Sequence, residues 1–359
     1  MCRLVQRRGI IGLFCLLFVA SSVVPGWAQK DNRFEVSKNL DIFNSLLKEV
    51  EMFYVDSVDV DKTVQRGIEA MLAGLDPYTE YYPEQKTEEL SLMTTGEYGG
   101  IGSLIRQRNN EGGVMIAEPT EGMPADLAGL KPGDLILAID TIDVSKATNS
   151  RVSELLKGVP NTKMVLTIQR PGEKKPRKFE ITRKQITTPQ VTYYGVKNDS
   201  IGYIYLKAFT IKSAQEVKEA FLDLKKNHNI KSLVLDLRGN GGGVLEGAVQ
   251  IVGMFVPKGS EVLSTKGKIK QWDRTYRTST EPLDTVMPLA ILINGGTASA
   301  AEIVSGSLQD MDRAVLVGQR SFGKGLVQAP RDLPYNGKVK ITMSKYYIPV
   351  SYTHVRAHE

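Results

Sequence analysis

Two stretches of the sequence hold side chains that could perform covalent chemistry, and the first is GGTASAAEI around Ser299. An apolar run that predicts a buried strand ends here, and a helical pattern begins directly after the serine. A serine on such a turn, at the carboxyl end of a strand, is exposed and can act as a nucleophile. The amide of Ala300 lies at the helix start, where the helix dipole favours the negative charge that grows on a carbonyl oxygen during attack. The simpler interpretation of Ser299, a helix N-cap, stays open at this point.

A serine nucleophile needs a base, and few side chains of this chain can serve as one. His228 lies in the polar loop KKNHNI, and the other two histidines, His354 and His358, lie among the last residues. The second stretch, GQRSFGKGLVQ, holds Lys324 between two glycines, with Gln328 placed to orient its amine. Burial can lower the pKa of a lysine, ordinarily ~10.4, by several units, which would make Lys324 a base. The alternative interpretation, in which Lys324 is a flexible surface lysine, is equally compatible with these residues.

The same stretch matches the phosphate-binding pattern G-x-x-x-x-G-K, but Gly325 stands where that pattern needs Ser or Thr. The chain then continues as LVQAP, which predicts a strand instead of the helix that would bind a phosphate. A second glycine-rich turn, DLRGNGGG at 236–243, follows a strand but lacks the G-x-G-x-x-G spacing of a dinucleotide site. We interpret this turn as the source of a backbone amide that completes an oxyanion hole, braced by Asp236, Arg238 and Asn240.

The elements around these stretches predict an α/β layer with parallel strands. Fully apolar strand patterns alternate with amphipathic helical patterns over residues 187–349. Residues 96–186 hold short strand patterns between Gly and Pro turns, which predicts a β-rich module. Residues 34–73 carry apolar side chains at helical spacing and predict two helices. The fold class is therefore α/β and β-rich multidomain.

Both ends of the chain differ from the rest. Residues 1–28 have a basic start, a short apolar core and a small-residue end, which is typical of a secretory signal peptide; an uncleaved membrane anchor is the alternative. This segment holds three arginines and no acidic residue, so its removal lowers the formal net charge from +6 to +3, which gives no case for nucleic acid. It also holds both cysteines, so the mature chain would have no disulfide.

Residues 350–359, at the other end of the chain, resemble a translated sequencing adapter, and we expect them not to be protein sequence.

Five motifs together closely resemble those of the carboxyl-terminal processing peptidases, which are secreted serine proteases with a Ser-Lys dyad. The motifs are YGGIG, ADLAGLKPGD, DLRGNGGG, GGTASAAE and GQRSFGKGLVQ, and the resemblance covers residues 34–349. It implies an N-terminal helical region (29–95), a PDZ domain (96–186) and a crotonase-like α/β serine protease core (187–349) that is C-terminally truncated. It implies neither a metal nor a cofactor.

The resemblance also implies roles for the candidate residues. Ser299 would be the nucleophile of an endopeptidase that forms an acyl-enzyme, and Lys324 would be its general base. Gln328 matches the glutamine that positions the lysine in this family. The amides of Ala300 and Gly242 would form the oxyanion hole. The likeness of the lysine loop to a phosphate-binding pattern is then accidental.

The resemblance to a PDZ domain implies that residues 96–186 bind a substrate protein or peptide through its free, apolar C-terminus. Such domains add the peptide to a sheet edge and bind its terminal carboxylate with loop amides. The carboxylate-binding loop would consist of Tyr98, Gly99, Gly100, Ile101 and Gly102. The pocket for the last side chain would be lined by Ile101, Val152 and Leu155.

Two other functions stay open from the sequence: a non-catalytic PDZ adaptor that binds C-terminal peptides, and a crotonase-like acyl-CoA enzyme. The intact spacing of Ser299 and Lys324 argues against the first, and the signal peptide and PDZ module argue against the second. We expect an exported protein, located in the Gram-negative periplasm or anchored in the membrane. The resemblance is compatible with a homodimer and with an activating adaptor.

Overall fold

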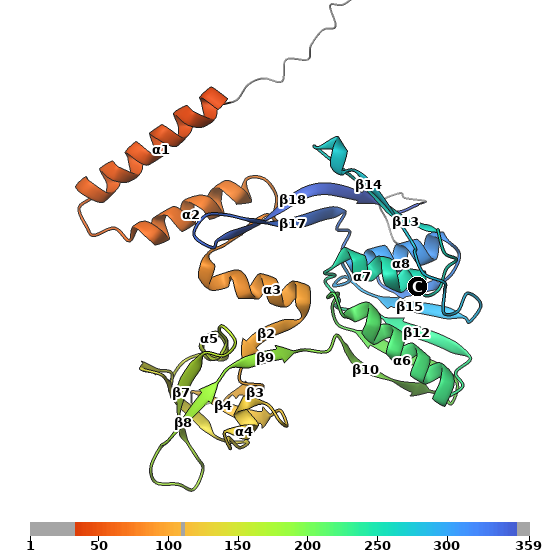
Figure 1. Ribbon diagram of the computed structural model, residues 1–359, viewed down its shortest axis with the longest axis horizontal. Coiled ribbons are helices and arrows are strands. Elements are labelled where there is room, and N and C mark those ends of the chain that lie inside the picture. Colours follow the sequence, from red (N-terminus) through yellow and green to blue (C-terminus); the bar gives the residue numbers. More distant parts are fainter. Residues whose placement is uncertain (1–32, 109–111, 350–359) are drawn as a thin grey trace, which may run out of the picture. The chain divides into compact units, whose positions relative to one another are not determined.

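The computed structural model describes residues 33–108 and 112–349 (Figure 1). The chain divides into two compact units, one that ends at Ile68 and one that begins at Glu69. The sequence interpretations of residues 1–28 and 350–359 concern segments outside the described residues.

The first unit holds helix α1 (Arg33–Phe53) and most of α2 (Val60–Ala73). Both helices lie where the apolar spacing predicts two helices, so this prediction is confirmed. α1 buries none of its residues, and Phe34, Leu40 and Leu46 are among its exposed apolar side chains. The apolar positions that predict this helix therefore do not form a buried core.

The second unit begins with three short elements. These are β1 (Glu80–Tyr82), a 3-10 helix (Glu84–Lys86) and α3 (Thr87–Thr95). α3 ends at Thr95 and is capped by Gly96, which has a φ of +72°, and the left-handed region at this position favours glycine. The chain then turns directly into the first strand of the β-rich module.

The β-rich module spans residues 97–187 and confirms the expectation for this region. Its strands are β2 (Glu97–Gly100), β3 (Ser103–Gln107), β4 (Val114–Pro119), β5 (Leu135–Ile139), β6 (Ile142–Asp143), β7 (Lys163–Gln169), β8 (Arg177–Thr182) and β9 (Lys184–Thr187). Its helices are α4 (Pro124–Leu127) and α5 (Asn149–Leu156). The main sheet has the order β3-β4-β5-β7-β8, with β6 paired to β5, while β2 pairs with β9. β3 therefore lies at an edge of the main sheet.

The α/β core contains a five-stranded sheet with the order β10-β11-β12-β15-β16. Its strands are β10 (Val191–Lys197), β11 (Ile201–Leu206), β12 (Ser232–Asp236), β15 (Leu289–Ile293) and β16 (Val315–Gly318). The last four strands are parallel, and β10 is antiparallel to β11. Its helices are α6 (Ser213–Asn227), α7 (Leu245–Gly253) and α8 (Ala300–Asp310). The predicted alternation of strands and helices is thus confirmed.

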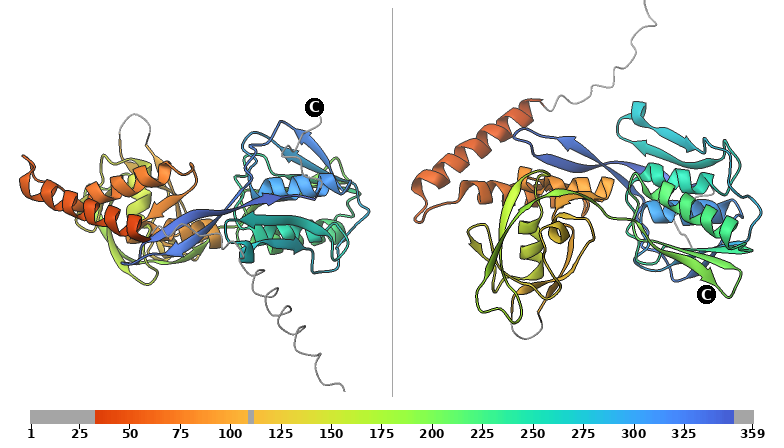
Figure 2. Two further views of the ribbon diagram at one scale, coloured as in Figure 1. Left: turned by 90° about the horizontal axis from the view of Figure 1, so that it is seen from above. Right: turned by 60° about the horizontal axis from the view of Figure 1, so that its bottom comes forward.

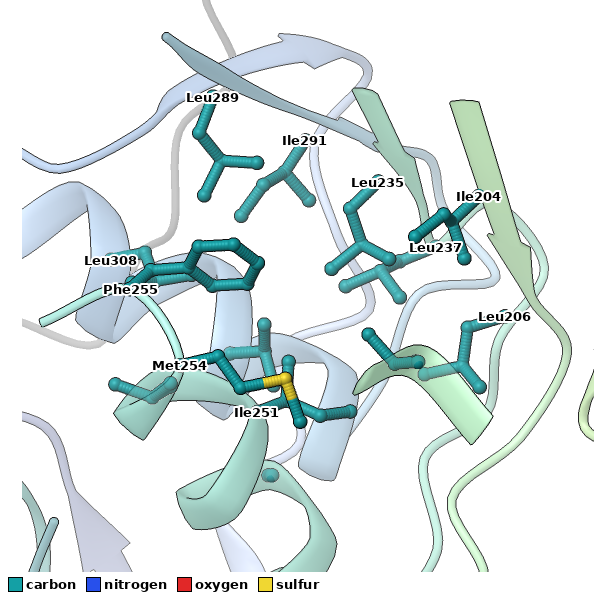
Figure 3. Close-up of a cluster of buried hydrophobic side chains, with 14 of the residues drawn as sticks. Ile204, Leu206, Leu235, Leu237, Ile251, Met254, Phe255, Leu289, Ile291 and Leu308 are labelled. Carbon is teal, nitrogen blue, oxygen red and sulfur yellow. The ribbon is translucent and has the colours of Figure 1, made fainter. Parts of the chain in front are cut away.

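Alternate residues of this sheet form an apolar cluster with residues of the helices (Figure 3). Ile204 on β11, Leu235 on β12 and Ile291 on β15 are all fully or almost fully buried in this cluster, together with Phe255 and Leu308. Since these strands are anchored by the same cluster, the turns at their carboxyl ends are held at one edge of the sheet.

Two of these turns contact each other through hydrogen bonds. The Thr297 hydroxyl, in the turn before α8, donates to the carbonyl oxygen of Leu237 at 2.8 Å. The amide of Ala298 donates to the carbonyl oxygen of Asn240 at 2.9 Å. The glycine-rich turn after β12 therefore lies against the turn that carries Ser299.

A third sheet completes the second unit. Its strands are β1, β13 (Glu261–Gly267), β14 (Arg274–Arg277), β17 (Leu326–Asp332) and β18 (Lys338–Tyr347), with a 3-10 helix (Lys270–Trp272) between β13 and β14. β17 and β18 form a long hairpin, drawn in blue in Figure 2. β18 also pairs with β13 and with β1. This sheet brings the residues around β1 beside the loop that carries Lys324.

Candidate active site

Ser299 directly precedes α8 and has an uncommon backbone conformation. Its φ is +55° and its ψ is −117°, a combination that L-residues rarely adopt. Such a conformation costs about 1–3 kcal/mol and occurs where the surrounding structure holds it in place. The side chain is half-buried, between the buried Ala298 and Ala300. The predicted turn at the carboxyl end of β15 is therefore present, and its geometry is typical of a nucleophile turn.

The carboxylate of Glu302 holds this turn against the lysine loop. Its Oε2 atom accepts hydrogen bonds from the amides of Ser299 (2.8 Å) and Lys324 (2.9 Å). Its Oε1 atom accepts from the Ser321 hydroxyl (2.7 Å) and from the Gly323 amide (2.6 Å). Glu302 is only 5% exposed, so these bonds replace its contacts with water. One buried carboxylate thus joins the backbones of the two predicted catalytic residues.

Tyr346 on β18 forms a second bridge between the same residues. Its hydroxyl donates to the carbonyl oxygen of Lys324 and lies 3.5 Å from the carbonyl oxygen of Ser299. Burial, with a smaller effect of the Glu302 charge, raises the pKa of Tyr346 well above its ordinary value, so the phenol stays a donor. The two bridges complement each other, because Glu302 accepts from the amides and Tyr346 donates to the carbonyl groups.

Sequence reasoning missed both bridging residues. Ser299 and Glu302 form the S-x-x-E pattern of a capping box, which could have indicated that the carboxylate contacts the serine amide. No local sequence pattern indicates that the Glu302 carboxylate also contacts the lysine loop. Tyr346 lies in the strand pattern KVKITMSKYYIP, where nothing distinguishes it from its neighbours.

Lys324 is half-buried and its surroundings favour the neutral amine. Burial is the main cause that lowers the pKa of Lys324 below its ordinary value, and the charge of Lys340 adds to the effect. Acidic side chains, with Glu80 first, oppose this shift in part. In the described part of the chain, no hydrogen bond joins Lys324 Nζ to the Ser299 hydroxyl; the Nζ atom lies 4.4 Å from the ring centre of Tyr78. The half-burial of Lys324 and its contact with the Tyr78 ring argue against the alternative of a flexible surface lysine.

Gln328, on β17, contacts a neighbouring strand in this structure. Its Nε2 atom donates to the hydroxyl of Thr342 on β18 at 3.1 Å. The expected hydrogen bond from Gln328 to Lys324 is not among the contacts of the described residues. The role of Gln328 in orienting the lysine therefore stays a prediction.

The two residues proposed for the oxyanion hole lie close together. A Cβ atom added to Gly242 would come 2.9 Å from the amide nitrogen of Ala300 and 2.8 Å from Ser299 Cβ. The Ala300 amide is at the start of α8, where amides have no intrahelical partner. The Gly242 amide, however, donates to Asn240 Oδ1 at 2.9 Å. This bond would have to be shared or broken before Gly242 could bind an oxyanion, so its role stays a prediction.

The residues expected to brace the glycine-rich turn do so. The buried carboxylate of Asp236 accepts hydrogen bonds from the amide and guanidinium of Arg238 and from the Tyr203 hydroxyl. Burial alone would raise the pKa of Asp236, but these hydrogen bonds hold it below its ordinary value. Asn240 donates through Nδ2 to the carbonyl oxygen of Leu206 at 2.8 Å. An open pocket above this cluster is lined by Tyr203, Tyr205, Asp236, Arg238 and Asn294.

The expected peptide-binding edge of the β-rich module is present. Among the described residues, β3 pairs only with β4 and therefore has a free edge, and α5 contacts β3. Ile101 and Val152 are buried in one apolar cluster, and Leu155 packs against it. The structure brings these three predicted pocket residues together, and their contact with a peptide stays a prediction.

The predicted carboxylate-binding loop is shorter than expected. Tyr98, Gly99 and Gly100 belong to β2 and pair with β9, so only Ile101 and Gly102 link β2 to β3. The prediction that all five residues form a loop is wrong, because the backbone of the first three is used in strand pairing.

Two contacts around β2 bear on carboxylate binding. Position 99 accepts only glycine, since the Cβ atom of any other residue would lie 1.8 Å from the carbonyl oxygen of Gly158. The Lys157 ammonium, 5.4 Å from the ring centre of Tyr98, places a positive charge nearby.

Comparisons with known proteins agree with this architecture. The model of peptidase family S41 matches residues 200–357, and a PDZ domain model matches residues 115–170. A carboxy-terminal-processing protease of Bartonella bacilliformis is 35% identical over 348 residues, which are 95% of this chain and 79% of the relative. A "probable CtpA-like serine protease" of Staphylococcus aureus is 33% identical over 315 residues. That match covers 87% of this chain but only 62% of the relative.

A solved structure of an S41 protease from Bacteroides fragilis has the same fold. It superposes with a TM-score of 0.50 at 18% identity and covers 80% of this chain and 81% of that chain. The expected combination of a PDZ domain with an α/β serine protease core is confirmed by these matches. Within residues 33–108 and 112–349, no helix is both long and apolar enough to cross a membrane.

Proposed function

The chain belongs to the carboxyl-terminal processing peptidases of family S41, and we propose that it is an exported serine endopeptidase that cleaves proteins near their C-termini. Ser299 is the nucleophile and Lys324 the general base of an acyl-enzyme mechanism. The observation that carries this proposal is the Glu302 carboxylate, which accepts hydrogen bonds from the amides of both residues. A structural N-cap serine would not need its turn joined to a lysine loop 25 residues further along the chain.

Acylation requires two proton transfers, one to the Lys324 amine and one from it. The Ser299 Oγ atom attacks the carbonyl carbon of the scissile peptide, and the hydroxyl proton passes to the neutral amine of Lys324. The lowered pKa of Lys324 supports this role, because a base must be neutral at the working pH. The new ammonium gives its proton to the leaving nitrogen as the C–N bond breaks.

Deacylation repeats the same steps with water. Lys324 takes a proton from a water molecule, whose oxygen attacks the ester carbon of the acyl-enzyme. The ester C–O bond then breaks, and the proton returns to Ser299 Oγ. The product is a new C-terminal carboxylic acid, and the two residues regain their starting protonation states.

The charge that forms on the carbonyl oxygen requires donors in place before the reaction. The Ala300 amide at the start of α8 is the first donor, and an amide of the glycine-rich turn, Gly242 in our proposal, is the second. The strained φ of Ser299 and the close approach of Gly242 support this arrangement. Loss of one such donor typically lowers kcat by roughly 10²–10³-fold.

The PDZ domain selects the substrate by its C-terminus. An extended tail would pair with the free edge of β3, and its terminal carboxylate would bind amides at the Ile101–Gly102 link. The positive charge of Lys157 favours a carboxylate at this end of the edge. The buried cluster around Ile101 and Val152 favours an apolar last residue.

Location and assembly are part of the same proposal. The basic and apolar pattern of residues 1–28 supports export to the periplasm, with a retained membrane anchor as the alternative. Fractionation of expressing cells, with the N-terminus of the soluble form determined by mass spectrometry, tests this directly. Family membership supports a homodimer and an activating adaptor as further partners, which size-exclusion chromatography with light scattering can examine.

Cleavage of an unfolded protein with an apolar C-terminal tail tests the proposed activity. The parent protein, Ser299→Ala and Lys324→Ala are incubated with this substrate, and mass spectrometry follows the products. We expect products from the parent only, with a rate that rises with pH as Lys324 loses its proton. Tail binding without cleavage by the parent would contradict the protease proposal and favour the PDZ adaptor.

A further inference from the structure

One contact of the active site comes from a segment far away in the sequence. The ring of Tyr78 covers the Lys324 amine, with 4.4 Å between Nζ and the ring centre. Tyr78 lies in the turn before β1, and β1 pairs with β18 at Glu80 and Lys340. This pairing carries the turn to the lysine loop.

The turn itself is fixed by Asp76. Its Oδ1 atom accepts hydrogen bonds from the amides of Tyr78 (2.7 Å) and Thr79 (2.8 Å), and its Oδ2 atom accepts from the Thr79 hydroxyl (2.9 Å). Tyr78 therefore contacts Lys324 from a backbone with little freedom. The ring is held in place before any substrate binds.

The same turn is connected to the predicted positioning glutamine. The buried hydroxyl of Thr79 accepts a hydrogen bond from the Thr342 amide at 3.1 Å and lies 3.4 Å from the Thr342 hydroxyl. That second hydroxyl accepts from Gln328 Nε2. The Asp76–Thr79 turn thus contacts Lys324 through the Tyr78 ring. It is linked to Gln328 through the hydroxyl groups of Thr79 and Thr342.

We propose that the Asp76–Thr79 turn is the positioning element of the general base, in which the Tyr78 ring holds the Lys324 amine and shields it from water. The Thr79–Thr342 pair anchors Gln328 in the same element. The role of this turn in the reaction rests on the proposed function, whereas its effect on Lys324 does not. Tyr78 is a positioning residue, since it contacts the base and not the scissile peptide.

The ring has two opposite effects on the lysine. Its face attracts an ammonium group, which raises the pKa, whereas its bulk removes water from the amine, which lowers the pKa. Burial is the largest cause that lowers the pKa of Lys324, and the Tyr78 ring lies directly against the amine, so we expect its shielding to outweigh its attraction. The charged and titratable groups that face Lys324 are Asp76 and Glu80 near β1, Lys340 and Tyr346 on β18, and Glu302 on α8. All of them remain when Tyr78 alone is replaced.

Competitive labelling with acetic anhydride measures Lys324 without any need for activity. Full-length Ser299→Ala protein is labelled across pH, and the acetylated fraction of Lys324 is quantified by peptide mass spectrometry. We expect Tyr78→Ala to raise the titration midpoint of Lys324 by about one pKa unit and to increase its labelling rate at high pH. Tyr78→Phe keeps the ring and should retain the Ser299→Ala profile. Tyr81→Ala is the matched control, because Tyr81 lies three residues further along, in β1, but packs beside Gly337.

Kinetics of the otherwise unchanged enzyme provide the second readout. A shift of one pKa unit leaves about tenfold less neutral lysine at neutral pH. We therefore expect Tyr78→Ala to lose about tenfold in kcat, to keep its KM, and to move the pH profile of kcat upward. Tyr78→Phe should restore kcat. Thermal unfolding of each variant shows whether the fold keeps the stability of the parent.

The outcomes separate this inference from the proposed function. An unchanged Lys324 titration in Tyr78→Ala, or an equal shift in Tyr81→Ala, would overturn the positioning role. A higher kcat in Tyr78→Ala would overturn it as well, because the ring would then restrain the base. If the parent fails to cleave tailed proteins but the labelling shift is present, the protease proposal fails and the effect of Tyr78 on Lys324 stands.

Discussion

Replacement of Glu302 by glutamine tests the bridge between the two catalytic residues. The carboxylate oxygens have separate partners: Oε2 accepts from the amides of Ser299 and Lys324, and Oε1 accepts from Ser321 and Gly323. A glutamine can accept at only one of these positions, so its NH₂ group must face the other pair. The Ser321 hydroxyl can rotate and accept from this NH₂ group, whereas the amides cannot. We therefore expect the glutamine oxygen to remain on the two catalytic residues.

The size of the effect follows from this orientation. Only the Gly323 amide then lacks a partner, and the other bonds lose their charged acceptor. Loss of a hydrogen bond to a charged group costs about 1.5–3 kcal/mol, so the free energy of unfolding should fall by about this amount in Glu302→Gln. Glu302→Ala leaves all four donors without a partner and should lose considerably more stability and all measurable cleavage.

A double-mutant cycle with Ser321→Ala distinguishes this account from general damage. In the parent, Ser321→Ala removes a hydrogen bond to a charged acceptor, about 1.5–3 kcal/mol, whereas in Glu302→Gln it removes only a neutral hydrogen bond, about 0.5–1.5 kcal/mol. The double variant should therefore lose about 1 kcal/mol less than the sum of the single variants. Denaturant unfolding gives the stabilities, and kcat/KM for a tailed substrate gives the activities. Additive stabilities, or a Glu302→Gln protein with parental stability and activity, would refute the reasoning.

Three further replacements test separate parts of the site. Tyr346→Phe removes a donor to the Lys324 carbonyl group and should cost about 1–3 kcal/mol of stability, measured by denaturant unfolding; an unchanged stability would contradict the second bridge. Gly242→Ala forces a Cβ atom to 2.8 Å from Ser299 Cβ at a φ of +92°, so kcat should fall at least about tenfold while tail binding, measured by fluorescence anisotropy, is retained. Gly99→Ala should have the opposite signature, with tail affinity at least about tenfold weaker and cleavage of a short untailed peptide unchanged; loss of both activities would indicate unfolding instead.

The α/β core could be predicted because its signals are local. Buried parallel strands are continuous apolar runs, so β11, β12 and β15 are visible in the sequence, and the turn that carries Ser299 follows from the last of them. The third sheet could not be predicted in this way. β1 and β18 pair between Glu80 and Lys340, and no local pattern encodes a pairing between such distant segments.

The same distinction explains the candidate site. Ser299 and Lys324 have recognisable surroundings of glycines and small residues, and their motifs indicate a dyad. Tyr78 and Tyr346 act through contacts made only in the folded chain, and other tyrosines lie nearby in the sequence of each, so that no local pattern distinguishes them. The sequence predicts a loop at residues 98–100, where the structure has a strand, because glycine is typical both of a turn and of a strand that another backbone approaches closely.

The most direct test of the central claim is covalent labelling of the folded protein by a fluorophosphonate, with the modified residue identified by peptide mass spectrometry. We expect a single adduct on Ser299, formed at a rate that rises with pH through a titration below ~10.4, the ordinary pKa of lysine. Lys324→Ala should abolish this labelling, because the serine then has no base. An adduct on another residue, or labelling of Ser299 at the parental rate in Lys324→Ala, would contradict the account.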